Sequence, residues 1–207
     1  YQKYVKAYYR MITQVDAEIG KIRKLLEDKG ISGNTVIIFA SDNGYYLGDR
    51  QLADKWLMYE TSIRIPMIVY DPRVESGIVK EPVLNIDIPS TILDLASIPE
   101  PEYYQGVSLV NYYQRERKIH KRNAILFEHL WEKEEIPSSE GIRTDRWKYF
   151  RYRFIDASEE LYDLKKDPLE TKNLASDPEY KKIVEGLREQ CDEQIQEYKS
   201  RKLPDPK

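Results

Sequence analysis

The spacing of apolar positions predicts the elements of the first hundred residues. Between residues 4 and 29 apolar side chains recur every three or four positions, which indicates a helix with one apolar face, and Gly30 supplies its stop. Residues 35–40 and 65–70 are short apolar runs without polar alternation, as expected of strands buried in a parallel sheet. Residues 87–97 predict a further helix, with Pro89 in its first turn.

The pattern changes after about residue 115. Short alternating segments at 124–128, 141–144 and 147–152 predict an antiparallel sheet with one wetter face, and segment 160–164 follows them. Residues 178–200 predict a final amphipathic helix. We therefore predict an α/β fold, with an α/β part over residues 1–115 and a smaller subdomain, an antiparallel sheet and a terminal helix, over residues 116–207.

Cys191 is the single cysteine of the chain, so no internal disulfide can form. Its neighbours are acidic, and acidic neighbours raise the pKa of a thiol rather than activate it. We expect Cys191 to pack on a face of the final helix without a chemical role.

Composition and charge exclude two classes of partner. The 33 basic and 36 acidic residues are interspersed and give a net charge of -3, so no basic face is available for nucleic acid. No apolar run reaches the length that a membrane-spanning helix needs. The first residues, 1–4, already have the pattern of a helix interior, from which we expect the chain to be part of a longer protein.

Candidate chemistry follows directly after the first predicted strand, at Asp42, Asn43 and Gly44. Ligands of α/β sheets bind beyond the carboxyl ends of the strands. Carboxylate and amide oxygens suit calcium or magnesium rather than zinc, and Gly44 is expected to turn the backbone so that both side chains face one point. The same tripeptide is also common in ordinary turns, so by itself it leaves a plain loop open.

Four motifs around this tripeptide resemble the type I, formylglycine-dependent sulfatases. In chain order they are Ser41–Gly44, Leu47-Gly48, Lys55 before Tyr59-Glu60, and Arg64-Ile65-Pro66. The resemblance continues through residues 85–96, 141–149 and 160–174, so it covers nearly the whole chain. It implies part of an alkaline-phosphatase-like α/β sandwich with a C-terminal subdomain, in which residues 1–115 belong to the catalytic domain.

The resemblance also implies roles for three residues. Asp42 and Asn43 would be ligands of one calcium ion, with magnesium less favoured, and Lys55 would contact a sulfate oxygen. The alternative for Lys55 is a solvated surface lysine. The nucleophile of the family comes from a Cys/Ser-x-Pro-x-Arg motif, which neither Cys191 nor any serine satisfies. We therefore expect this chain to be inactive alone. The family implies a secreted, periplasmic or lysosomal location.

Weaker candidates lie in the second part of the chain. Residues 127–131 could overhang the site, where His129 would bind a sugar hydroxyl or a sulfate oxygen and Trp131 would stack on a sugar. A structural hydrogen bond and a core position are their respective alternatives. Arg143 could reach an acidic substrate, or it could form an ion pair at a sheet edge. His120 is expected to be a solvated loop residue.

Three functions stay open on the sequence. The first is hydrolysis of a sulfuric ester, with a sulfated sugar or glycan as the substrate. The second is a phosphodiesterase or phosphonate hydrolase of the same superfamily, against which Asn43 in place of a histidine favours a single calcium ion. The third is a non-catalytic, sugar-binding or oligomerising module. Because part of a sheet exposes an edge and an apolar face, we also expect the chain to self-associate or to pair with its N-terminal part.

Overall fold

The computed structural model describes residues 1–114, 119, 121–131, 136–153 and 158–201. His120 and the predicted boundary between residues 115 and 116 lie outside these ranges. The helices are α1 (Gln2–Asp28), α2 (Glu60–Ile63), α3 (Asp87–Leu95), α4 (Val110–Tyr113) and α5 (Lys181–Ser200), with 3-10 turns at Ser32–Asn34, Asp49–Gln51 and Pro178–Tyr180. The strands are β1 (Ile37–Ala40), β2 (Tyr46–Leu47), β3 (Ala53–Asp54), β4 (Met67–Tyr70), β5 (Ala124–His129), β6 (Ser139–Thr144), β7 (Trp147–Tyr152) and β8 (Glu159–Asp163).

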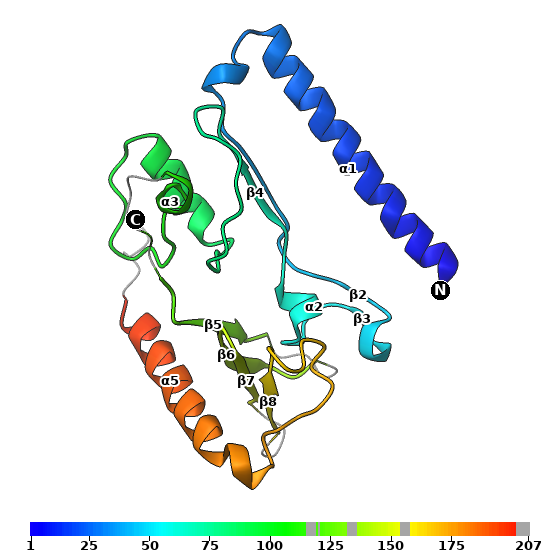
Figure 1. Cartoon of the computed structure of the whole chain (residues 1–207), viewed down its shortest axis with the longest axis vertical. Coiled ribbons are helices and arrows are strands. Elements are labelled where there is room, and N and C mark those ends of the chain that lie inside the picture. Colours follow the sequence, from blue (N-terminus) through cyan, green and yellow to red (C-terminus); the bar gives the residue numbers. More distant parts are fainter. Residues whose placement is uncertain (115–118, 120, 132–135, 154–157, 202–207) are drawn as a thin grey trace.

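Helix α1 confirms the helical period of the first residues, and it lies at the periphery of the molecule (Figure 1). It ends before Gly30, whose φ of 68° is the left-handed conformation that glycine adopts at low cost. None of its residues is buried, and most of its apolar side chains are exposed to solvent. The exposed apolar residues of α1 include Tyr4, Tyr9, Met11, Ile12, Val15, Ile22 and Leu25.

Strands β1 and β4 pair antiparallel, from Ile37 opposite Tyr70 to Ala40 opposite Met67. The prediction of a parallel arrangement is therefore wrong for this pair, because the connection contains only the β2–β3 hairpin and the single turn of α2. A parallel pair needs a crossover of a dozen or more residues, usually a helix, that carries the chain back to the other end of the sheet. As a consequence, the residues after β1 and those before β4 lie at the same end of the pair.

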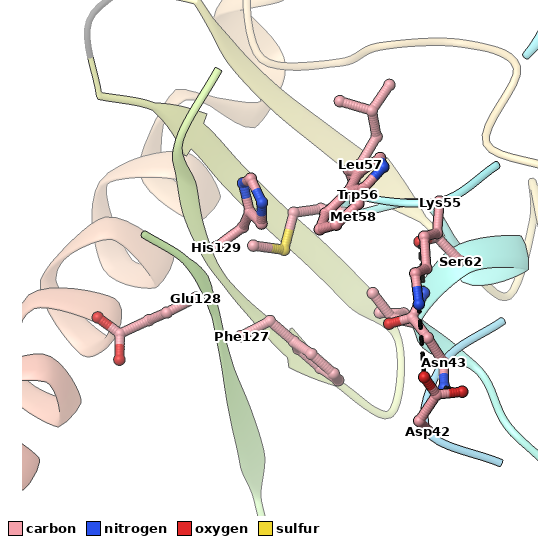
Figure 2. A pocket seen from close by; sticks show the side chains of 11 residues that line it. Asp42, Asn43, Lys55, Trp56, Leu57, Met58, Ser62, Phe127, Glu128 and His129 are labelled. Carbon is pink, nitrogen blue, oxygen red and sulfur yellow. Dashed lines mark hydrogen bonds and ion pairs between the residues drawn. The ribbon is translucent and has the colours of Figure 1, made fainter. Parts of the chain in front are cut away.

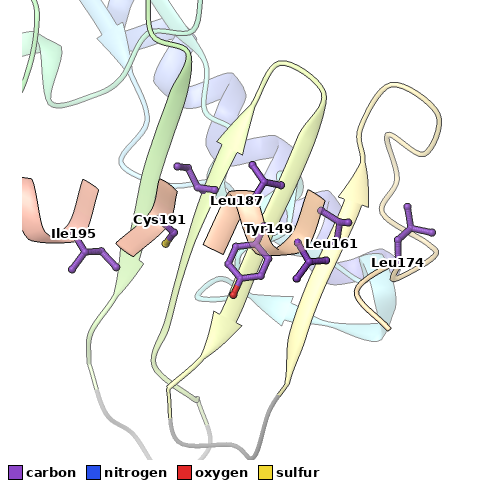
Figure 3. Close-up of a cluster of buried hydrophobic side chains, with 8 residues drawn as sticks. Tyr149, Leu161, Leu174, Leu187, Cys191 and Ile195 are labelled. Carbon is purple, nitrogen blue, oxygen red and sulfur yellow. The ribbon is translucent and has the colours of Figure 1, made fainter. Parts of the chain in front are cut away.

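The C-terminal part confirms the predicted sheet and helix. Strands β5 to β8 form an antiparallel sheet in chain order, and α5 packs across one of its faces (Figure 3). The core between them is formed by Ile142, Tyr149, Leu161, Leu174, Val184, Leu187, Cys191 and Ile195. Cys191 has no exposed surface, and burial raises the pKa of its thiol to about 12, as expected of a packing residue.

The other face of this sheet packs against the segment that leads into α2. Phe150 and Tyr162 are buried there with Met58, and Tyr59 covers them. The hydroxyls of Tyr59, Tyr152 and Tyr162 all donate to the carboxylate of Glu160, which accounts for part of the tyrosine bias of the chain. The sheet therefore holds the chain segment that precedes α2. Within the described residues, no helix combines the length and apolar character needed to cross a membrane.

Candidate functional site

A cavity of about 260 Å³ lies where the loop after β1, the segment before α2 and strand β5 meet (Figure 2). Asp42, Asn43, Lys55 and Ser62 gather on one side of it, while β5 approaches from the other side. The remaining lining residues are mostly apolar: Trp56, Leu57, Met58, Ile63, Phe127, Glu128 and His129. The cavity thus combines a polar side with an apolar and aromatic side.

The loop after β1 fixes Asn43 through its amide nitrogen. Nδ2 of Asn43 donates to the carbonyl oxygen of Gly44 at 3.1 Å and to Oγ of Ser62 at 3.2 Å. Because the nitrogen is used in this way, Oδ1 is the side-chain atom of Asn43 that can bind a cation. The backbone N–H of Asn43 donates to Oδ1 of Asp42 at 2.8 Å, which holds the neighbouring carboxylate beside the amide.

Gly44 is required for a different reason from the predicted turn. Its N–H donates to the carbonyl oxygen of Ser62 at 2.6 Å, so the loop touches α2 backbone to backbone. A Cβ at this position would lie 2.1 Å from the carbonyl oxygen of Thr61, a distance that no side chain allows. The glycine therefore permits the close approach that fixes Asp42 and Asn43 relative to α2.

Lys55 points to the same side of the cavity. Its Nζ lies 3.4 Å from Oδ2 of Asp42, and its side chain is 31% exposed. The backbone N–H of Asn43 and the ammonium of Lys55 hold the pKa of Asp42 below its ordinary value, so this carboxylate stays ionised at neutral pH. Among the described residues that line the cavity, Lys55 is the one lysine or arginine. Lys55 is thus partly buried and in contact with Asp42, and its contact with a sulfate oxygen stays a prediction.

The backbone around Lys55 is strained. Asp54 and Trp56 adopt φ angles of 72° and 96°, and Arg50 and Gln51 are also left-handed. Such conformations cost energy in residues other than glycine and persist only where the surroundings impose them. One such restraint is visible at Arg50, whose guanidinium lies 3.8 Å from the ring centre of Tyr59 and donates to the carbonyl oxygen of Leu169 at 3.1 Å.

Asp42 and Asn43 fit a hard cation as part of a larger ligand set. They offer a carboxylate and an amide oxygen, and calcium takes six to eight oxygen ligands. Within the described ranges no group of three or more His, Cys, Asp or Glu residues could hold a metal ion. Asp42 and Asn43 would therefore supply only part of the ligand set of a calcium ion.

His129 of β5 lines the cavity, and Trp131 follows this strand without lining the cavity, so the predicted contacts of both with a sugar stay predictions. Both ring nitrogens of His129 are buried without a hydrogen-bond partner. The ring of Trp56, which was not among the predicted site residues, lies 5.5 Å from His129 and 5.3 Å from Trp131. Trp131 does not line the cavity and is 54% exposed, and the side chain of Glu128 points away from it (Figure 2).

Arg143 lies outside the cavity. Its Nε donates to Oε1 of Glu60 at 3.0 Å, so the structure favours the ion-pair alternative for this residue. Lys148 also contacts Glu60, at 3.2 Å, and forms an ion pair with Glu170. Sequence reasoning missed this cluster because Glu60 stood out only as part of a motif. Its partner Lys148 is 88 positions away along the chain.

Comparison with known proteins places the chain in a family. The profile of the family described as N-sulphoglucosamine sulphohydrolase, C-terminal, matches residues 48–197. The chain belongs to this family. An N-acetylglucosamine-6-O-sulfatase from Bacteroides thetaiotaomicron is 33% identical in an alignment of 207 positions, which covers 96% of this chain and 37% of that protein.

Two solved structures share the fold of the chain. One is a protein in complex with its substrate D-glucosamine-2-N,6-O-disulfate, with a TM-score of 0.82 and 30% identity over 91% of this chain and 39% of that chain. The other is a phosphonate monoester hydrolase from Agrobacterium radiobacter, with a TM-score of 0.82 and 26% identity over 92% of this chain and 41% of that chain. The predicted alkaline-phosphatase-like fold with a C-terminal antiparallel sheet and helix is thereby confirmed.

The chain spans about two fifths of the length of these relatives. Residues 48–197 correspond to the C-terminal region of sulfatase-family proteins, as the description of the matching family says. The roles of individual side chains in this chain rest on their geometry.

Proposed function

We propose that the full-length protein is a calcium-dependent sulfatase that hydrolyses a sulfuric ester on a sugar. The observation that carries this proposal is the convergence of Asp42, Asn43 and Lys55 on one cavity. Family membership supports the reaction class, and the named substrates of two relatives, an N-acetylglucosamine-6-O-sulfate and D-glucosamine-2-N,6-O-disulfate, support a sulfated sugar.

Each residue on the polar side of the cavity has a separate task in this proposal. Asp42 and Asn43 would hold the calcium ion through a carboxylate oxygen and an amide oxygen. Calcium, when bound, neutralises charge on the sulfate group. The ammonium of Lys55 binds a sulfate oxygen and stabilises the charge that develops as the S–O bond breaks. Without substrate it lies 3.4 Å from Asp42, which keeps it on the correct side of the cavity.

The aromatic side of the cavity would receive the sugar. His129 carries two buried ring nitrogens without partners, and a sugar hydroxyl or a sulfate oxygen would supply one. Trp131 and the neighbouring Trp56 offer aromatic faces on which a pyranose ring could stack. Arg143 is engaged with Glu60, so we assign it no contact with the substrate.

The experiment that tests this proposal uses the full-length protein with glucosamine-6-sulfate. Sulfate release is measured with calcium and with EDTA, and release that depends on calcium is the expected result. Absence of sulfate release from every sulfated sugar tried, in the presence of calcium, would contradict the proposal.

A second candidate is hydrolysis of a phosphonate monoester, which the match to the phosphonate monoester hydrolase favours. The two candidates differ in the charge and geometry of the transferred group rather than in the fold. Phenyl phenylphosphonate assayed beside the sulfated sugar separates them. A kcat/KM that is higher for the phosphonate than for every sulfated sugar would favour this second candidate.

A further inference from the structure

A group of charges, two of them fully buried, lies at the start of α2 and outside the cavity, and no step of the proposed reaction uses it. Its members are Glu60 of α2, Arg143 of β6, Lys148 of β7 and Glu170 of the loop after β8. We infer that this charge cluster positions the amide of Asn43 for cation binding, acting through α2 and Ser62. The inference rests on the proposed function, because it concerns how the same site is held in place.

The cluster fixes the start of α2 in three ways. The backbone N–H of Glu60 donates to Oε2 of Glu170 at 2.7 Å. Its carboxylate accepts from Nε of Arg143 at 3.0 Å and from Nζ of Lys148 at 3.2 Å. Both the main chain and the side chain of the first residue of α2 are therefore held by the C-terminal sheet and the loop that follows it.

The burial of these charges makes their geometry hard to change. The side chains of Lys148 and Glu170 are only 2% and 3% exposed. Burial lowers the pKa of Lys148, although Glu170 and Glu60 oppose this shift. Burial would raise the pKa of Glu60, but Lys148 and Arg143 outweigh it and leave this pKa below its ordinary value. Two cations thus balance two carboxylates, and the loss of one partner would leave an uncompensated buried charge.

The link to the metal site is two residues long. Ser62, which is 2% exposed, follows Glu60 within the single turn of α2. Its Oγ accepts from Nδ2 of Asn43 at 3.2 Å, and its carbonyl oxygen accepts from the N–H of Gly44 at 2.6 Å. Together with the carbonyl oxygen of Gly44, Ser62 therefore fixes which way the amide of Asn43 faces. A shift of α2 would move both contacts together, and partners that orient a metal ligand commonly change metal affinity.

A merely structural role for the cluster makes a different prediction. A buried ion pair that only stabilises the fold would change the melting temperature and leave the affinity for calcium as it is. A positioning role changes both, and its effect on calcium must pass through Ser62. The test therefore measures calcium binding as well as stability.

The experiment is a double-mutant cycle in the full-length protein. Calcium dissociation constants are measured by isothermal titration calorimetry with calcium chloride for Ser62→Ala, Lys148→Met and the double variant. Each single change is expected to weaken calcium binding by about 10- to 100-fold. The calcium dissociation constant of the double variant should be no higher than that of the single variant with the higher constant. This is expected because both changes interrupt the same chain of contacts from the charge cluster through Ser62 to Asn43.

Arg188→Gln is the control, because it breaks the ion pair between α5 and β8, with Glu159 at 2.6 Å, which does not involve α2. It should lower the melting temperature and leave the calcium dissociation constant unchanged. If Lys148→Met does not fold, Glu170→Gln replaces it, since this change keeps the size of the side chain. The inference is overturned if the cluster variants behave like the control, or if their effects on calcium binding simply multiply with that of Ser62→Ala. Absence of calcium binding by the unmodified protein would instead contradict the proposed function.

Discussion

The C-terminal sheet buries its apolar residues, whereas the region of α1, β1 and β4 leaves many of its apolar residues exposed. The sheet β5–β8 buries one face against α5 and the other against the segment before α2, so it has a core of its own (Figures 1 and 3). Helix α1 has no buried residue, and β4 leaves Ile68 and Tyr70 exposed. One region is thus stabilised within this chain, whereas the other presents apolar faces that nothing in the described residues covers.

The difference shows how the candidate site is held. Asp42 and Asn43 follow β1, in the region with open faces, but their loop is fixed to α2. Helix α2 is in turn held by Arg143 and Lys148 of the closed sheet. Asp42 and Asn43, the proposed calcium ligands, therefore follow strand β1, whose region exposes its apolar residues. The contacts that hold them in place come from the C-terminal sheet, whose faces are both covered.

The largest expected effect tests this contrast in stability. Leu161→Ala removes a side chain with no exposed surface from the core of the sheet and should lower the free energy of unfolding by about 2–5 kcal/mol. Ile12→Ala on the open face of α1, where Ile12 is 49% exposed, should cost less than about 0.5 kcal/mol. Urea unfolding of the 207-residue chain measures both changes. Equal losses of stability would contradict the claim that the sheet has a buried core and that the face of α1 has none.

A second prediction concerns chemistry at the border of the two regions. Lys55→Ala in the full-length protein should lower kcat for sulfate release by about 10²- to 10³-fold, because it removes the positive charge that binds a sulfate oxygen while the S–O bond to the sugar breaks. Lys165→Ala removes an exposed lysine away from the cavity and should leave kcat unchanged. A kcat for Lys55→Ala within twofold of the unmodified enzyme would show that the ammonium does not act on the reaction.

The open faces predict self-association of the isolated chain. Light scattering should detect dimers or larger species at high concentration, because contiguous exposed apolar surface favours association. Ile12→Glu places a charge in the middle of the apolar face of α1 and should weaken association by roughly 10-fold. A monodisperse monomer at high concentration would contradict this prediction.

The smallest expected effect is a pH-dependent change in stability from the ion pair between Arg188 and Glu159, where α5 packs on the C-terminal sheet. The guanidinium of Arg188 and the hydroxyl of Tyr149 hold the pKa of Glu159 below its ordinary 4.5 in the folded protein. This ion pair therefore stabilises the fold above that pH, and its contribution is lost as the pH falls through the folded-state pKa. Arg188→Gln should cost about 1 kcal/mol at pH 7 and almost nothing near the acid limit of stability, as urea unfolding at several pH values would reveal. A cost that does not change with pH would contradict the assignment.

The sequence predicted those elements whose pattern reflects burial directly. The period of α5 and the alternation of β5–β8 record which face of each element packs. The period of α1 predicted the helix, although the described residues do not bury its apolar face. The direction of β4 relative to β1 was not predictable, because an apolar run indicates burial and says nothing of the strand beside it. The division of the chain between residues 115 and 116 stays a prediction.

The candidate site was predictable only in part. Asp42, Asn43 and Lys55 lie in a short stretch with a recognisable order, so their convergence could be expected. Trp56 reaches the site because its backbone adopts a left-handed φ of 96°. A tryptophan at this position gives no indication of such a conformation. Glu60 and Lys148 lie 88 positions apart in the sequence, and only the tertiary structure brings their charges into contact.

The most direct test of the account is a crystal structure of the full-length protein with calcium and sulfate. If the three side chains form one site, a calcium ion should lie about 2.3–2.6 Å from a carboxylate oxygen of Asp42 and from Oδ1 of Asn43. Nζ of Lys55 should contact an oxygen of the sulfate. A calcium ion bound elsewhere, or an Asn43 amide turned away from it, would contradict the central claim that these three side chains form one site.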